Sequence, residues 1–392
     1  MRFPLHIIAG ISLLSALIAG CGNVSANHKE PPEITDNAEI QAANDETPDD
    51  AAKPENGEIA DNAADHVEPT DDVVPETAVN TGNDGCPAIT SLDPLCEKQR
   101  AILDEIKQDA DPEVLFAVHQ ETIGRHYLVS DEKHPDLFRP SIENKGGTYI
   151  GVGFEQGYLY IGWQRPTLAF LIDYDPWVVL NHRVLVEVAK KCETAQCLHD
   201  HFLKRDVAEA FLKSPEAAAA GFTTKDAMHR IQRLRYAVSQ ALTKLRGAEY
   251  PTFMNTPEIY DYVRGMILSG RLRVVQANLL DSVGMNSIAD AMKQLGAELQ
   301  TLYLSNAEQY WSYPDQFKTN MLSLPFAENG IVMRTRATYP RNSDYRYSIQ
   351  PANIFRIWMA RDKTRAVKPM TKHVSIRRPD QFPFVVDDLM PE

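Results

Sequence analysis

Small, acidic and amide residues that could hold a nucleoside recur at four places in the chain, each at the end of an apolar run. Gly151 and Gly153 follow the first run, where glycines let the backbone approach a ligand and the next helix offers unpaired N–H groups. Asp173 and Asp175 end the second run, 20 and 22 residues beyond Gly153, where a carboxylate can accept hydrogen bonds from ribose hydroxyls. The candidate cofactor site is completed by Asn278, Asp281, Ser305 and Asn306.

Each of these features also has an ordinary structural explanation. A Gly-x-Gly after a strand is often a tight turn, and Asp175 before Pro176 is typical of a helix N-cap. Asn306 is equally well placed to cap the helix that follows it. A carboxylate or amide within residues 278–281 can reach an adenine ring. Taken together, the order and spacing of the features support a nucleoside site as well as the structural explanations. Both interpretations stay open at this point.

Strands and helices that would position these residues alternate along the chain. Short, continuous apolar runs predict strands that are buried on both faces, as in a parallel sheet, and helical spacing predicts helices between them. We therefore expect an α/β, Rossmann-like fold with a mostly parallel sheet and helices on both faces. The expected strands are residues 146–153, 168–172, 272–277, 299–304, 331–337 and 345–350. The expected helices are residues 95–106, 113–127, 154–163, 178–246 with breaks, 258–268, 282–295 and 354–360.

Three motifs resemble those of the Rossmann-like S-adenosylmethionine-dependent methyltransferases. Residues 151–153, 173–175 and 278–281 look like the first three motifs of that family, within a similarity that runs over residues 147–325. The resemblance implies a site for S-adenosylmethionine. Gln156 stands where the dinucleotide fingerprint has a third glycine, which disfavours NAD and leaves S-adenosylmethionine or no cofactor.

A narrower resemblance points to an uncharacterised, methyltransferase-like family. It rests on residues 149–153, on the His182-Arg183 pair and above all on residues 302–308. Where Ser305-Asn306 stands, amino-methylating enzymes carry an acidic or Asn-Pro-Pro motif that polarises the target nitrogen. No proline follows here, so the resemblance does not imply this role for Ser305 and Asn306. His182 and Arg183 could line the mouth of the pocket or pair with nearby carboxylates.

The N-terminus predicts export and lipidation. Residues 7–18 form an apolar run that is shorter than the roughly 20 residues a membrane span needs, so residues 1–20 fit a cleavable signal peptide. Residues 17–21 resemble the lipobox of bacterial lipoproteins, which implies cleavage before Cys21 and its lipidation; an ordinary signal peptide is the alternative. Gly22 rather than Asp follows, which favours the outer membrane. We expect a lipid-anchored protein of the bacterial cell envelope.

An acidic segment follows Cys21 and predicts a disordered tether over residues 21–85. It holds 17 Asp and Glu against two Lys, a net charge of −15, and it lacks aromatic residues. Because the whole chain carries −14, the remainder is close to +1. The acidic balance therefore describes the tether, and nothing in the remainder resembles a basic nucleic-acid footprint.

Four cysteines follow the tether, an even number that suits disulfides in an oxidising compartment. Three pairings are possible, of which Cys86–Cys96 with Cys192–Cys197 is the most economical. His199 and His201 follow Cys197, so a zinc site is the alternative at that pair.

The expected domain organisation is compatible with two functions. A helical lead-in over residues 86–146 precedes a methyltransferase-like domain over residues 147–392, with a helical insert at about 178–270. The first hypothesis is binding of S-adenosylmethionine or a related nucleoside. Since that cofactor is made in the cytoplasm, the alternative is a non-catalytic module that recognises an envelope protein or glycan. Candidate stacking residues are Tyr158, Tyr160, Trp163, Trp177, Tyr310, Trp311 and Tyr313. The sequence contains no motif typical of a hydrolase.

Overall fold

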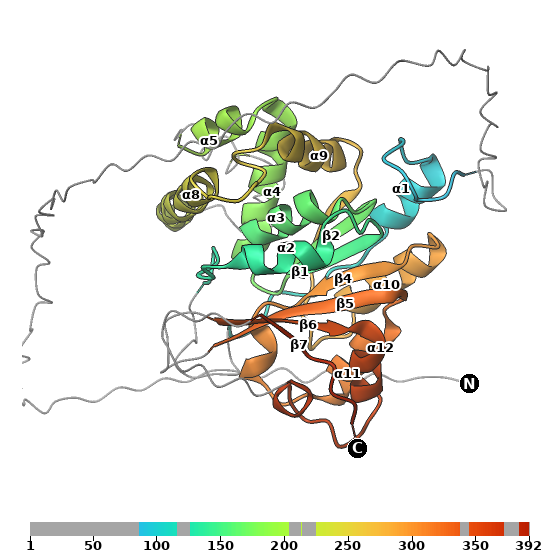
Figure 1. Ribbon diagram of the computed structural model, residues 1–392. Helices are drawn as coiled ribbons and strands as arrows, with labels where there is room; N and C mark the ends of the chain where they lie inside the picture. The colour runs from blue at the N-terminus through green and yellow to red at the C-terminus, as the bar shows by residue number, and fades with distance from the viewer. Residues whose placement is uncertain are drawn as a thin grey trace, which may run out of the picture. The chain divides into compact units, whose positions relative to one another are not determined.

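A seven-stranded sheet forms the centre of the computed structural model (Figure 1). The structure describes residues 86–115, 126–203, 213, 225–337, 345–371 and 384–391. The expected signal peptide, Cys21 and the acidic tether lie outside the described residues, as does most of the expected helix over residues 113–127. Within the described ranges, no helix is both long and apolar enough to cross a bilayer.

The sheet has the order β3-β2-β1-β4-β5-β6-β7. Strands β1 to β5 run parallel, β6 pairs antiparallel with β5, and β7 runs parallel to β6. The expected mostly parallel α/β sheet is confirmed. Its strands are β1 (Thr148–Val152), β2 (Leu168–Asp173), β3 (Leu272–Gln276), β4 (Leu299–Tyr303), β5 (Phe326–Ala337), β6 (Tyr345–Pro351) and β7 (Phe384–Val386).

Strand order reverses between β1 and β4, where an open α/β sheet has its ligand crevice. The register brings the carboxyl ends of the central strands to one edge, since Gly151 pairs with both Leu171 and Tyr303, and Asp173 pairs with Gln276. Residues that follow these strands must therefore lie close together, although they are far apart in the sequence.

Helices cover both faces of the sheet because successive side chains of a strand point to opposite sides. Tyr149 of β1 joins one core with α2 (Arg139–Ile142), α3 (Glu155–Gln164), α4 (Pro176–Lys191), α5 (Ala195–Leu203), α8 (Lys225–Arg246) and α9 (Pro257–Leu268). Its neighbour Ile150 joins the other core with α1 (Glu97–Asp104), α10 (Gly284–Gln294), α11 (Asp315–Ser323) and α12 (Ala352–Met359). In Figure 1, α4, α5, α8 and α9 lie above and to the left of the strands, whereas α11 and α12 lie below and to the right.

Most expected elements agree with the observed ones to within a few residues. Gly296 follows α10 with a φ of +61°, and Ala297 N–H donates to Met292 O, as expected of a glycine that ends a helix. Helix α11 and strand β7 were not expected, and β5 begins five residues earlier than residue 331. Both economical disulfides, Cys86–Cys96 and Cys192–Cys197, are present.

Candidate functional site

A cavity of about 390 Å³ lies at the carboxyl ends of β1, β2, β3 and β4. Its volume falls within the range of small-molecule sites, which is roughly 300–1,000 Å³. Six of the eight cofactor-site residues expected from the sequence line it: Gly153, Asp173, Asp175, Asn278, Ser305 and Asn306. The sheet topology thus brings together residues that are separated by up to 153 positions.

The other two expected residues, Gly151 and Asp281, do not line the cavity. Gly151 lies inside β1, and a side chain there would collide with the Tyr149 ring, whose hydroxyl oxygen is 2.2 Å from the ideal Cβ position. Gly151 therefore makes room for Tyr149 in the core. Asp281 is exposed, and its carboxylate accepts a hydrogen bond from Ser282 N–H at 2.6 Å.

Gly153 lines the cavity in a backbone conformation that favours glycine, with a φ of +88°. His182 of α4 contacts this turn and α3 at the same time: its Nε2 lies 2.8 Å from Gly153 O, and its Nδ1 lies 3.0 Å from the Tyr158 hydroxyl. A carbonyl only accepts, so Nε2 carries the proton and Nδ1 accepts from Tyr158. Burial lowers the pKa of His182 to about 4, which keeps the ring neutral. His182 therefore positions the glycine turn and does not line the pocket.

We expect His182→Ala to lower the free energy of unfolding by about 3 kcal/mol, because it leaves the buried Tyr158 hydroxyl and the half-buried Gly153 O without their hydrogen-bond partner. Urea denaturation measures this change. The adjacent Arg183→Ala is the matched control: Arg183 donates to Gln108 in an exposed contact, and its loss should cost less than about 1 kcal/mol. Equal losses in the two variants would contradict the positioning role.

Asp173 and Asp175 have different surroundings, although both were expected to accept hydrogen bonds from a ribose. Asp175 caps α4: its carboxylate accepts from Trp177 N–H at 2.9 Å and pairs with His126 at 3.0 Å. Asp173 ends β2, and one of its oxygens accepts from Asp175 N–H at 2.9 Å. Burial raises the pKa of Asp173 to about 7. The Asp173 carboxylate also accepts from the backbone N–H groups of Gly153 and Tyr174, so both carboxylates have structural partners. Asp173 is the more exposed of the two, at 7 % against 1 %, and is therefore the better ribose acceptor.

The β3 side of the cavity is apolar apart from Asn278. Leu279, Leu280 and Ala277 line this wall with Asn278, whose Oδ1 accepts from Leu280 N–H at 3.0 Å. The buried carboxylate of Asp109 accepts from the backbone N–H of Asn278 at 2.8 Å. Asp109, from the segment before the sheet, thus holds this apolar wall, whose composition suits a purine ring.

The β4 side of the cavity is polar. Ser305, the residue after Leu304 at the end of β4, has a φ of +51°, a strained conformation for a residue other than glycine. Asn306 does not cap the following helix; its Nδ2 donates to the hydroxyls of Tyr310 and Tyr345 at 3.4 and 3.3 Å. The Tyr345 hydroxyl donates to Asp131 at 2.8 Å. A ligand in the cavity would meet amide, phenol and carboxylate groups at this end.

Glu132 is buried behind the polar end of the cavity, where the Ser305 hydroxyl lies 3.3 Å from its Oε1. No sequence pattern predicted that Glu132 belongs to the site. Tyr303 has one hydroxyl proton, yet its oxygen lies 2.7 Å from Glu132 Oε1 and 2.9 Å from Gln156 Oε1. Gln156 Nε2 donates to Glu132 Oε2 at 2.7 Å. If Glu132 is protonated, it donates to Tyr303, Tyr303 donates to Gln156, and a closed ring satisfies all three groups. Burial raises the pKa of Glu132 to about 7, which agrees with this arrangement.

Three buried carboxyl groups at or beside the cavity make stability depend on pH: Asp173, Glu132 and Glu155 of α3, whose carboxylate accepts from Ser130 N–H at 2.9 Å. Burial raises the pKa of Glu132 and Glu155 from 4.5 to about 7, and that of Asp173 from 3.8 to about 7. The folded state therefore binds more protons than the unfolded state between about pH 4.5 and 7. We expect the free energy of unfolding to fall as the pH rises through this range, by up to about 1.4 kcal/mol per pH unit for each group.

Urea denaturation at pH 5, 6, 7 and 8 measures this dependence. The Glu132→Gln variant, which cannot ionise, should show a shallower slope than the parent chain. A free energy of unfolding that rises from pH 5 to pH 7 would contradict the raised pKa of these buried acids.

The aromatic residues that could stack on a ligand divide into two groups. Tyr310 and Trp311 line the cavity. Tyr158, Tyr160, Trp163, Trp177 and Tyr313 are buried and do not line it, and the Tyr313 hydroxyl donates to Glu308 at 2.6 Å. Only the first group is available to a ligand in this cavity, so the aromatic residues alone do not define a separate binding surface.

The fold and the cavity define the chain as a mostly parallel α/β protein with a ligand-sized cavity at the topological switch point of its sheet. It belongs to the family described as a domain of unknown function, DUF7790, whose profile matches residues 127–382. The matched region contains β1 to β6 and every cavity-lining residue except Pro112 and Val114. No curated protein matches the chain.

Proposed function

We propose that the α/β unit binds an adenosyl nucleoside, S-adenosylmethionine or its demethylated product, in the cavity at the ends of β1 to β4. The observation that carries this proposal is the meeting of Gly153, Asp173, Asn278 and Ser305, from four strand ends, around a single cavity of about 390 Å³. These residues lie in motifs whose order resembles that of the methyltransferases. They also follow the carboxyl ends of the strands, the sheet edge at which many α/β proteins bind their ligands.

Chemical complementarity supports this assignment. The apolar wall of Leu279 and Leu280 suits the adenine ring, and Asp173 is placed to accept from the ribose hydroxyls. The polar end, with Asp131, Asn306 and Tyr345, suits the charged amino-acid part of the ligand or a methyl acceptor. Such a site would offer each part of the ligand a matching surface.

The proposed location of the protein is the bacterial cell envelope, with a lipid anchor on Cys21. The lipobox-like residues 17–21 and the acidic segment before Cys86 support it. An envelope location would separate the protein from the cytoplasmic supply of S-adenosylmethionine, so binding must be tested before turnover. A folded chain that ignores adenosyl ligands would favour the alternative, a non-catalytic module that binds an envelope partner.

A thermal-unfolding panel on the full-length chain tests the ligand class. S-adenosylmethionine and S-adenosylhomocysteine at 100 times the dissociation constant should stabilise the folded state by about 2.7 kcal/mol and raise Tm by several degrees. NAD and free methionine are the controls, and neither should raise Tm to the same extent. A larger shift with NAD than with either adenosyl ligand would overturn the proposed specificity.

A further inference from the structure

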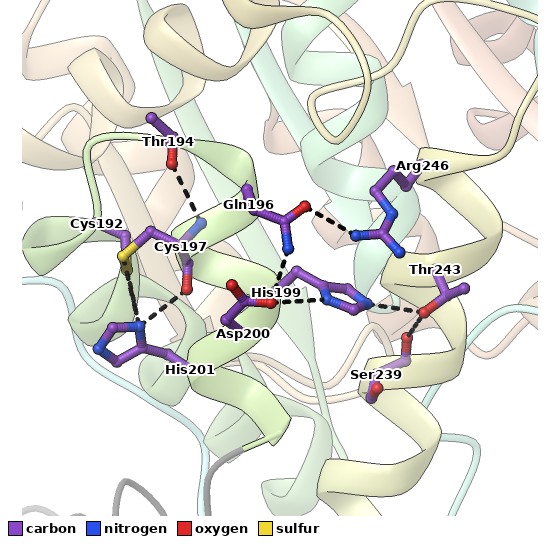
Figure 2. Close-up of polar contacts among 10 residues, drawn as sticks. All are labelled: Cys192, Thr194, Gln196, Cys197, His199, Asp200, His201, Ser239, Thr243 and Arg246. Carbon is purple, nitrogen blue, oxygen red and sulfur yellow. Dashed lines mark hydrogen bonds and ion pairs between the residues drawn. A yellow bond between two sulfur atoms is a disulfide. The ribbon is translucent and has the colours of Figure 1, made fainter.

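Two cysteines and a histidine lie together where α4 ends and α5 begins, outside the cavity. Figure 2 shows the His201 ring facing the sulfur atoms of Cys192 and Cys197. His201 Nδ1 lies 3.4 Å from each Sγ atom, and the three possible ligand atoms all lie within 4.8 Å of one another. Cys192 is buried, whereas Cys197 and His201 are half-buried, so the cluster is open to solvent on one side.

These separations match the edges of a metal tetrahedron. With Zn–S bonds of about 2.3 Å and Zn–N bonds of about 2.0 Å, a tetrahedral ion holds sulfur and nitrogen about 3.5 Å apart and two sulfurs about 3.8 Å apart. The two Sγ–Nδ1 distances already have this value. The two sulfur atoms are bonded to each other, so they do not yet have the separation that a metal ion requires.

In addition to the disulfide, hydrogen bonds hold the backbones of both cysteines in place. The Tyr260 hydroxyl of α9 donates to Cys192 O at 2.8 Å. At the start of α5, Thr194 Oγ1 accepts from Cys197 N–H at 3.2 Å (Figure 2). Because these contacts do not involve the sulfur atoms, reduction of the disulfide leaves the two side chains close enough to share a ligand.

We propose that Cys192, Cys197 and His201 form a zinc site that opens when the Cys192–Cys197 disulfide is reduced. A dithiol reductant supplies the two electrons: it becomes a cyclic disulfide, and the two cysteines become thiols. Zn²⁺ then binds both sulfurs as thiolates and releases two protons. His201 Nδ1 gives up its hydrogen bond to Cys197 O and coordinates as the Nε2–H tautomer. Two thiolates neutralise the charge of the ion, and the fourth position is left to water.

His199 is excluded from this site by its orientation, although it lies two residues from His201. Its Nε2 lies 2.9 Å from Thr243 Oγ1, and Thr243 donates in turn to Ser239 O at 2.7 Å. His199 thus connects α5 to α8, on the side of the helix away from the sulfurs (Figure 2). The two histidines of one helix make a matched pair, one at the cluster and one in a packing contact.

The test is a Co²⁺ and Zn²⁺ titration of the full-length chain after reduction with a dithiol, removal of the reductant and exclusion of oxygen. We expect one equivalent of Co²⁺ to produce thiolate-to-cobalt charge-transfer absorption that Zn²⁺ abolishes, and the oxidised chain to show neither. His201→Gln should weaken Zn²⁺ binding at least tenfold, and His199→Gln should leave it unchanged. The Cys86→Ser/Cys96→Ser double variant should keep the full signal.

Alkylation provides an independent measurement. In the reduced parent chain, Zn²⁺ should slow the reaction of Cys192 and Cys197 with iodoacetamide but not that of Cys86 and Cys96. The proposal is overturned if the reduced chain gives no charge-transfer absorption, or if His201→Gln binds Zn²⁺ as tightly as the parent. Equal protection of all four cysteines, or loss of the folded far-ultraviolet circular dichroism spectrum on reduction, would overturn it as well.

Discussion

Replacing Asp173 with Asn should weaken the binding of S-adenosylhomocysteine about 100-fold with little change in the stability of the chain. Under the proposed function, the Asp173 carboxylate accepts from both ribose hydroxyls, and each hydrogen bond to a charged group contributes about 1.5–3 kcal/mol. Asn offers one accepting oxygen and no charge. Burial raises the pKa of Asp173 to about 7, so removing the charge favours the folded state, whereas Asn keeps only one oxygen for the backbone N–H groups of Asp175, Gly153 and Tyr174. Since these two effects oppose each other, the free energy of unfolding should stay close to that of the parent chain.

Asp175→Asn is the matched control for this prediction. Asp175 also lines the cavity, but its carboxylate is occupied by Trp177 N–H and His126. This variant should lose about 1 kcal/mol of stability and change the affinity for the nucleoside by less than about threefold. Isothermal calorimetry and urea denaturation on the same samples measure both quantities. If Asp175→Asn loses binding and Asp173→Asn keeps it, the assignment of the ribose acceptor is reversed.

Glu308→Ala should lower the free energy of unfolding by about 3–5 kcal/mol. Glu308 and Arg334 form an ion pair of 2.7 Å in which both side chains are at most 3 % exposed. Tyr313 also donates to Glu308, and Arg334 donates to Gln350 at 2.9 Å. Removing the carboxylate leaves a guanidinium buried without its main counter-charge, which is among the costliest changes in a protein interior.

Two further variants separate this effect from a general loss of contacts. Glu308→Leu combined with Arg334→Met removes both charges and should cost less than Glu308→Ala alone. Glu143→Ala removes an exposed ion pair between Arg139 and Glu143, which should cost less than about 1 kcal/mol. The measurement is urea denaturation of all three variants. A Glu308→Ala cost no larger than that of Glu143→Ala would contradict the buried-pair account.

The sheet and the position of the cavity could be predicted from the sequence because both depend on local patterns. Continuous apolar runs such as Leu168 to Ile172 are typical of central parallel strands, and a parallel sheet brings the residues after its strands to one edge. The glycine turn at Gly153 and both disulfides were predicted for the same reason: each is encoded within a short segment.

The roles of individual side chains depended on contacts between distant segments and could not be predicted in this way. Asp173 and Asp175 are equivalent in the sequence, and only the contact of His126 and the start of α4 with Asp175 distinguishes them. Glu132 and Tyr345 reach the site from a loop before β1 and from β6, without any motif of their own. The different directions of His199 and His201 likewise follow from how α5 packs against α8.

The most direct test of the proposed function is a calorimetric titration of the full-length chain with S-adenosylhomocysteine at pH 8. We expect one binding site with a dissociation constant near 1 µM, a free energy of about −8 kcal/mol. The absence of binding heat up to millimolar ligand, in a chain that unfolds cooperatively, would contradict it. The cavity would then belong to a scaffold whose ligand is not an adenosyl nucleoside.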